Sequence, residues 1–425
     1  MRGRLAIVVA VGVSACLDPQ ALPPLRFDVP VDQVWRDGAP AVAPAVSGER
    51  RLIVTNSLDD SVSVVSWDGL INGAVDNAAD NTAAQLARFP VGLVPFEREG
   101  PHHVTVDPAG AFAFIGISNF VPGGGSGPHG VHGGGTADGR VLKVDLATLR
   151  TVAAVRVDKN PGDIRLSPDG STLIVSHFDL VRVAEAAAAG IERGPELDAR
   201  LALLDPVTLE RTRFVSLCPA PHGVAFTSDG NTLVSSCLSD EAAVVDLAAA
   251  KAGAADADVV VRLPLLDAPG TGQLPNCGPY AVTMGPADRT AWVSCYSSGE
   301  LVAVDVAAKT RGQTVALPGL AVFGDVSDAG DVLAIATQDT DGLMLLQIGA
   351  DDALSARQFI PFSPDVCGLP HTALFLDGDT RLAVVCEGNK REPGRVIAVD
   401  VASGEVIGGV SVGIFPDDIG LQVTP

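Results

Sequence analysis

Three segments of the sequence share a frame in which two cysteines enclose a turn signal. They are CPAPHGVAFTSDGNTLVSSC (218–237), CGPYAVTMGPADRTAWVSC (277–295) and CGLPHTALFLDGDTRLAVVC (367–386). The first and third carry a histidine, His222 and His371, soon after the first cysteine, and the second carries Tyr280 there. Because a segment that recurs along a chain indicates a repeat architecture, these copies constrain the fold more than any other feature.

The same unit continues along the chain without the cysteines. Each copy has an apolar strand, a Gly/Asp turn, a second strand, a third strand that ends in an aspartate, and a fourth strand. These aspartates, where a short acidic side chain can begin a turn, are Asp145, Asp205, Asp246, Asp305 and Asp400. Seven such units fit between residues 40 and 413. The period predicts an all-β chain folded as a seven-bladed β-propeller of four-stranded antiparallel blades.

Two stretches also resemble a known family. LIVTNSLDDSVSVVSWDG (52–69) and LSPDGSTLIVSH (166–177) resemble the YVTN repeat of bacterial seven-bladed propellers, and the resemblance covers nearly the whole mature chain. It departs from the family at Val322 to Gly324, where the proline before the first strand is missing. The tail FPDDIGLQVTP (415–425) looks like another first strand, so we expect it to return to the first unit and close the ring. The family serves many roles, so the resemblance implies a fold and no single function.

The N-terminus has the pattern of an export signal. MRGRLAIVVAVGVSAC has two arginines, a short apolar run and small residues before Cys16, and the run is too short to span a bilayer. VSAC resembles the bacterial lipobox, which implies that residues 1–16 are a lipoprotein signal peptide ending at a lipidated Cys16. Residues 17–39 would then be a tether, and 40–425 the propeller. The alternative is an ordinary signal peptide with a stray cysteine.

Leu17 follows the cysteine, which by resemblance to enterobacterial sorting rules favours the outer membrane over the inner one. The mature protein would face the periplasm or the cell surface and touch the membrane through its lipid alone. The formal net charge of −22 argues against nucleic acid as a partner and against electrostatic docking on anionic lipid.

Six cysteines remain after Cys16, and in an oxidising compartment they imply disulfides. Six cysteines allow 15 pairings, and the repeat frame favours pairs within blades: 218–237, 277–295 and 367–386. A four-residue turn at 228–231 makes His222 face Cys237, so a folded-back loop brings Cys218 within reach. Each bridge closes a loop of about 20 residues, which stabilises by roughly 3 kcal/mol in the chain-entropy model. The rival hypothesis is a Cys/His metal site.

All seven histidines fall on connections of one face of the predicted propeller or on the strand ends beside them. His129 and His132 lie in a glycine-rich insertion and His177 ends a second strand; the candidate pocket consists of His102, His103, His222, Tyr280 and His371. A ring of imidazoles is a ready site for a transition metal. We predict that three of them, His102, His222 and His371, converge at one mouth of the central channel and bind one ion, copper or zinc. The alternative is that these histidines only pack against neighbouring blades.

His103 is the next residue of its strand after His102, so it should point to the other side of the sheet. The stretch 176–200 contains the one convincing helical segment, around Val183 to Arg193, which should cap the histidine face as a lid or a gate to a pocket.

Two classes of function remain. The first is a lipid-anchored binding module whose histidine face takes an envelope protein or a small ligand. The second is a propeller enzyme, either a metal-dependent oxidoreductase or a lactonase-like hydrolase, with its site at the channel mouth. The sequence has no CxxCH motif for c-type haem and no GxSxG or HExxH motif, which favours the binding module.

Overall fold

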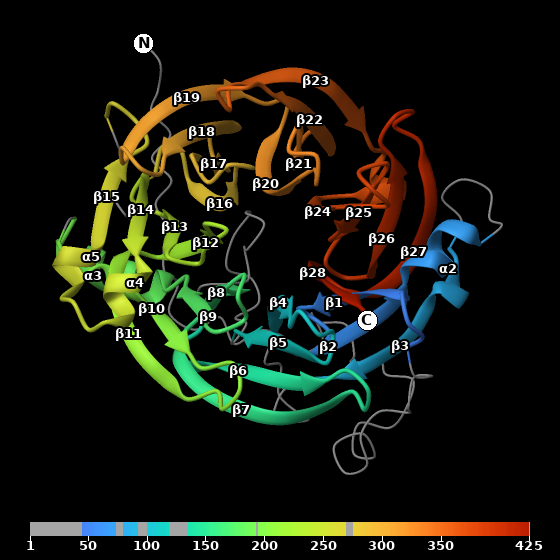
Figure 1. The fold of residues 1–425 in the computed structure, drawn as a ribbon, viewed down its shortest axis with the longest axis horizontal. Coiled ribbons are helices and arrows are strands. Elements are labelled where there is room, and N and C mark those ends of the chain that lie inside the picture. Colours follow the sequence, from blue (N-terminus) through green and yellow to red (C-terminus); the bar gives the residue numbers. More distant parts are fainter. Residues whose placement is uncertain are drawn as a thin grey trace.

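The computed structural model describes residues 45–73, 80–91, 100–118, 134–192, 194–268 and 275–424. Cys16, the expected signal peptide and tether, His129 and His132 lie outside these residues. The strands β1 to β28 form seven sheets of four strands each, and Figure 1 shows these sheets as blades around one axis. The predicted seven-bladed β-propeller of four-stranded antiparallel blades is confirmed.

Each blade runs from an innermost strand at the axis to an outermost strand at the rim. In that order, blade 1 consists of β28 (Pro416–Val423), β1 (Arg50–Asn56), β2 (Ser61–Ser66) and β3 (Gln85–Pro90). Blade 2 consists of β4 (Pro101–Val106), β5 (Phe112–Ile117), β6 (Asp138–Asp145) and β7 (Arg150–Lys159). Blade 3 consists of β8 (Pro161–Leu166), β9 (Leu173–His177), β10 (Asp198–Leu204) and β11 (Arg211–Pro219). Blade 4 consists of β12 (Pro221–Phe226), β13 (Thr232–Cys237), β14 (Glu241–Asp246) and β15 (Val260–Pro264). Blade 5 consists of β16 (Pro279–Met284), β17 (Thr290–Cys295), β18 (Glu300–Asp305) and β19 (Thr310–Ala316). Blade 6 consists of β20 (Leu320–Val326), β21 (Val332–Gln338), β22 (Gly342–Ile348) and β23 (Leu354–Pro361). Blade 7 is β24 (Pro370–Leu376), β25 (Arg381–Cys386), β26 (Pro393–Asp400), β27 (Val406–Ile414).

The C-terminal tail closes the ring, as its sequence predicts. β28 pairs antiparallel with β1, from Arg50 opposite Val423 to Asn56 opposite Pro416. Blade 1 therefore takes its innermost strand from the end of the chain and its other three from the beginning, which Figure 1 shows as red β28 beside blue β1. The pairing joins the two ends of the propeller, so the ring is held by backbone hydrogen bonds and not by packing alone.

The core consists of apolar layers between neighbouring blades. Ile53 and Val64 of blade 1, for example, pack against Ile115 and Leu142 of blade 2. Equivalent clusters lie at the other six blade boundaries, including the boundary between blade 7 and blade 1. Each blade thus buries both of its faces, and this accounts for the nearly continuous apolar runs in the second and third strands.

The structure contains three disulfides, Cys218–Cys237, Cys277–Cys295 and Cys367–Cys386, and they are the predicted pairs. They occupy all six cysteines of the propeller, so the rival Cys/His metal site is not formed. Disulfides are typical of an extracellular or periplasmic protein. One detail of the predicted register is wrong: Cys237 faces Pro221 and not His222, because β12 carries a bulge after Pro221.

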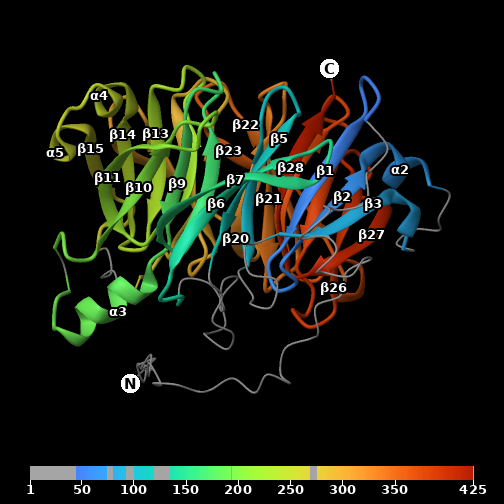
Figure 2. The same ribbon diagram turned by 90° about the horizontal axis from the view of Figure 1, so that it is seen from below.

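The described helices are short: α2 (Trp67–Asn72), η2 (Thr82–Ala84), α3 (Leu180–Ala188), α4 (Leu247–Lys251), α5 (Asp256–Val259) and α6 (Pro364–Cys367). Among the described residues, no helix combines the length and apolar character that crossing a membrane would need. α3 corresponds to the helix expected around Val183 to Arg193 but spans Leu180–Ala188, and the Asp179 side chain caps its N-terminus by accepting from Arg182 N. Figure 2 shows α3 projecting beyond the strand ends of one face, and Figure 1 places it near the rim of the ring.

Candidate functional site

The innermost strand of every blade carries a β-bulge at the same place. In β4, for example, Pro101 faces Ile117 and Val104 faces Ile115, so two residues of β4 oppose one residue of β5. The same shift occurs in the other six innermost strands. A bulge redirects side chains, and here both bulge residues can turn towards the axis.

The two bulge positions form two sets of seven residues, one residue from each blade. The first set, from blade 1 to blade 7, is Asp417, His102, Gly162, His222, Tyr280, Val322 and His371. The second set is Asp418, His103, Asp163, Gly223, Ala281, Phe323 and Thr372. The first set contains four of the five predicted pocket residues, and the second contains His103. The five side chains are all buried.

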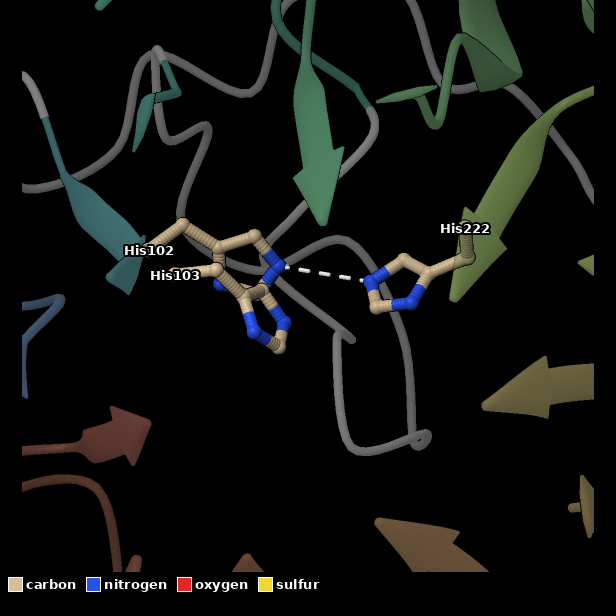
Figure 3. Close-up of side chains that lie close together, drawn as sticks. All are labelled: His102, His103 and His222. Carbon is tan, nitrogen blue, oxygen red and sulfur yellow. Dashed lines mark hydrogen bonds between the residues drawn. The ribbon is translucent and has the colours of Figure 1, made fainter. Parts of the chain in front are cut away.

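His102, His103 and His222 form a compact group, which we call the axial histidine site. His102 Nε2 lies 3.4 Å from His222 Nε2, and Figure 3 shows these two rings pointing at each other from β4 and β12. The ring centroids of His103 and His222 are 5.4 Å apart. One ring nitrogen from each of the three residues lies within 4.8 Å of the others. The expectation that His103 points to the other side of its sheet is wrong, because the bulge breaks the alternation between His102 and His103.

Two aspartates of the closing strand β28 orient these imidazoles. His102 Nδ1 is 2.9 Å from Asp417 Oδ2, and His103 Nδ1 is 3.0 Å from Asp418 Oδ2. An ionised carboxylate only accepts hydrogen bonds, so each Nδ1 carries the proton and the lone pair lies on Nε2. Burial lowers the pKa of His102 and of His103 well below the usual value, which keeps both rings neutral near pH 7. Neutral imidazole with a carboxylate behind it is the usual form of a metal-ligating histidine.

The fifth predicted residue, His371, lies in a second group with Glu387 and Asp417, which we call the acidic axial site. His371 Nε2 is 3.7 Å from Asp417 Oδ1 and 3.9 Å from Glu387 Oε1. His371 Nδ1 donates to the carbonyl oxygen of Asp417 at 2.6 Å, so Nε2 accepts from the Tyr280 hydroxyl at 2.9 Å. Tyr280 also connects the two sites, because its ring stacks on His222 with centroids 4.5 Å apart. The set of three ligands predicted for a single ion thus differs in one member from the set that the geometry brings together.

Among the residues that the structure describes, the carboxyl groups around the axis outnumber the cationic side chains beside them. Asp163, Glu387, Asp417 and Asp418 are buried. Arg165 lies 3.2 Å from Asp163 and 3.6 Å from Asp418, and Lys390 lies 3.0 Å from Glu387. Burial raises the pKa of Asp163 to about 6 and that of Glu387 to about 8. Because a buried charge is costly unless it is paired, these carboxyl groups either hold a proton or share a bound cation.

Sequence reasoning missed Asp163, Asp417, Asp418 and Glu387. The first three had a usable signal, since PGDI (161–164) and PDDI (416–419) have the same form as PHHV (101–104). Aligning the six innermost strands that carry this proline places the aspartates at the histidine positions. Glu387 directly follows Cys386 at the end of β25, and no pattern in the chain distinguishes it.

His177 lies apart from both axial sites. It ends β9, is buried, and its Nδ1 donates to the carbonyl oxygen of Arg200. A pocket of about 450 Å³ lies here between α3 and blade 3, with His177, Asp158, Arg182 and Arg200 in its lining. Asp158 forms a two-point ion pair with Arg200 at 2.7 and 2.8 Å. This pocket lies under α3, away from the candidate pocket residues that the sequence predicts.

The chemistry available at the axis follows from these distances. In a tetrahedral site with metal–nitrogen bonds of about 2.0–2.1 Å, two nitrogens lie about 3.3–3.4 Å apart. The separation of His102 Nε2 and His222 Nε2, 3.4 Å, fits this value. Without a metal, the same contact is a hydrogen bond as long as one of the two nitrogens carries a proton. The histidine–carboxylate pair could alternatively act as a general base.

Comparisons with known proteins identify the fold and no family. No family model matches the sequence, and no curated protein matches it. Solved structures with a similar fold include the periplasmic gluconolactonase PpgL of Pseudomonas aeruginosa, at 19% identity and a TM-score of 0.60 over 89% of this chain and 100% of that chain. Hydrazine synthase of Kuenenia stuttgartiensis matches at 15% identity and a TM-score of 0.55, over 78% of this chain and 94% of that chain. The dihydro-heme d1 dehydrogenase NirN matches at 15% identity and a TM-score of 0.54, over 92% of this chain and 78% of that chain. At these identities the likeness shows a shared propeller fold.

Proposed function

We propose that this protein is an exported β-propeller that binds a transition-metal ion, copper or zinc, at the axial histidine site. His102, His103 and His222 would be the ligands, and Asp417 and Asp418 would hold the first two by their Nδ1 atoms. The observation that carries the proposal is the 3.4 Å separation of two buried Nε2 atoms whose rings point at each other. Imidazole suits both metals, and the bound ion would offset part of the buried negative charge.

Export is supported by the three disulfides. Anchoring through lipid at Cys16, preferentially in the outer membrane, completes the proposal and rests on the lipobox-like VSAC. An envelope protein that docks on the histidine face stays a prediction, as does the YVTN family. A metal ion is the ligand that the buried geometry supports best.

The test is Cu²⁺ binding by the full mature chain, purified without a metal-affinity tag. Electron paramagnetic resonance of the Cu²⁺-loaded protein should show nitrogen hyperfine structure from imidazole ligands. His222→Ala should weaken Cu²⁺ binding at least about tenfold, whereas His177→Ala, which removes a buried histidine far from the axis, should not. Absence of Cu²⁺ and Zn²⁺ binding, or equal affinity in the two variants, would overturn the proposal.

A lactonase is a second candidate. The fold is shared with a periplasmic gluconolactonase, and the His102–Asp417 pair has the form of an oriented general base. Both side chains are buried, which suits an ion better than a sugar lactone. Hydrolysis of gluconolactone that is lost in His102→Ala and unaffected by a chelator would establish the lactonase and reject a role for the metal in it.

A further inference from the structure

The acidic axial site is built differently from the axial histidine site. It combines the imidazole of His371 with the carboxylates of Glu387 and Asp417, and one ligand atom from each lies within 4.8 Å of the others. The three side chains come from β24, from the residue after β25, and from β28. All three are fully buried. The ring closure that brings β28 beside β24 therefore assembles this site.

Asp417 Oδ1 is the atom that points to a ligand here. It is buried and has no hydrogen-bond partner within the described part of the chain. The other oxygen, Oδ2, accepts from Ser57 Oγ at 2.5 Å and binds His102 Nδ1. A buried carboxylate oxygen without a partner costs free energy, so a cation at Oδ1 would stabilise the folded protein.

The distances suit a shared ion better than direct hydrogen bonds. His371 Nε2 is 3.7 Å from Asp417 Oδ1 and 3.9 Å from Glu387 Oε1, which is too long for a hydrogen bond. Two ligands about 2.1–2.2 Å from one metal ion lie about 3.6–3.8 Å apart at an angle near 120°. The three groups are thus spaced as ligands of one cation. The Tyr280 hydroxyl now donates to His371 Nε2 at 2.9 Å, and an imidazole nitrogen has one lone pair, so this hydroxyl must turn away when the cation binds.

We infer that the acidic axial site binds a second divalent cation, of the class that prefers oxygen ligands, such as Mn²⁺. Two carboxylates and one imidazole form a harder ligand set than three imidazoles, so the two sites select different metals. The inference does not depend on the proposed copper or zinc site, although Asp417 contacts both. The Lys390 ammonium, 3.0 Å from Glu387 Oε2, now supplies one positive charge and would compete with the ion.

The test is Mn²⁺ binding by the full mature protein. Binding is measured as the decrease in the electron paramagnetic resonance signal of free Mn²⁺. Gln338 Nε2 donates to Glu387 Oε1 at 2.8 Å. Glu387→Gln keeps the shape of the side chain and an oxygen for this contact but removes a charged ligand, so it should weaken Mn²⁺ binding at least about tenfold. Lys390→Met removes the competing ammonium and should tighten Mn²⁺ binding more than about threefold. His222→Ala should leave Mn²⁺ binding unchanged, which separates this inference from the proposed histidine site.

No Mn²⁺ binding by the unaltered protein would overturn the inference. The inference also fails if Glu387→Gln, folded by circular dichroism, binds Mn²⁺ as tightly as the unaltered protein. If Glu387→Gln fails to fold, Lys390→Met decides: unchanged or weaker Mn²⁺ binding contradicts a site in which the ammonium competes. Loss of Mn²⁺ binding in His222→Ala would assign the ion to the axial histidine site instead.

Discussion

His102 Nδ1 lies 2.9 Å from Asp417 Oδ2, although 315 residues separate the two along the chain. The contact exists only because β28 returns to blade 1 and pairs with β1. Ring closure and site assembly are therefore one event in this fold. The histidines come from β4 and β12, and the carboxylates that orient two of them come from the last strand.

The first prediction concerns the carboxylate behind His103. Asp418 Oδ2 lies 3.0 Å from His103 Nδ1 and accepts from Val104 N at 3.2 Å. Asp418→Asn keeps an acceptor but removes the charge that holds the ring, so Cu²⁺ affinity should fall about 10–100-fold. Competition with a chelator of known affinity measures this. Asp400→Asn, which alters an exposed turn aspartate, is the control, and equal affinities would show that Asp418 does not support the metal site.

The second prediction concerns Gly223, where two innermost strands approach closely. A Cβ on Gly223 would lie 2.5 Å from Ala281 Cα and 2.8 Å from the Tyr280 carbonyl oxygen. Gly223→Ala must therefore push β12 and β16 apart, at a cost of about 1–3 kcal/mol in the free energy of unfolding. Denaturant unfolding measures it. Gly116→Ala is the matched control, since the nearest atom to its new Cβ would be 3.5 Å away, and a Gly223 variant as stable as this control would refute the argument.

The fold could be predicted because the signals for strands and turns are local and repeat seven times. Asp145 and Asp400, for example, accept backbone hydrogen bonds from the residues two and three positions later, as their place at a strand end suggests. The disulfide pairs were predictable for the same reason, since each lies within one blade. None of these inferences needs the distance between blades.

The site could be predicted only in part, because it depends on contacts between blades. Alternation along β4 predicts opposite directions for His102 and His103, and the bulge after Pro101 overturns it. The roles of Asp417 and Asp418 emerge only once β28 is placed beside β4 and β24. His371 shares its strand position with His102, and both rings contact Asp417 of the blade between them, His102 at the side chain and His371 at the main-chain oxygen.

The third prediction concerns Cys16, which lies outside the described residues. If VSAC is a lipobox, Cys16→Ala should abolish incorporation of labelled palmitate and release the protein from the membrane fraction. Its six other cysteines form the three disulfides, so the label reports on Cys16 alone. A Cys16→Ala protein that still sediments with membranes, in buffer of high ionic strength, would reject lipid anchoring at this residue.

The fourth prediction concerns Asp325, whose carboxylate accepts from Phe375 N at 2.8 Å and Val326 N at 3.0 Å. Burial raises its pKa to about 6 from a usual value of 3.8, Asp328 adds to the rise, and Arg165 opposes it. The folded state therefore binds more protons than the unfolded state between about pH 4 and pH 6, and the stability contributed by protonated Asp325 is lost as pH rises through this window.

The side chain at position 325 cannot titrate in the Asp325→Asn variant. The free energy of unfolding of the variant, relative to that of the unaltered protein, should therefore increase by about 1–3 kcal/mol from pH 4 to pH 6. Denaturant unfolding of both proteins in the presence of a chelator measures this difference without a contribution from bound metal. Because the neighbouring carboxylates titrate in both proteins, only the difference between the two curves reports on Asp325. A difference that stays constant from pH 4 to pH 6 would mean that the hydrogen bonds from Phe375 and Val326 fully offset the burial of the charge.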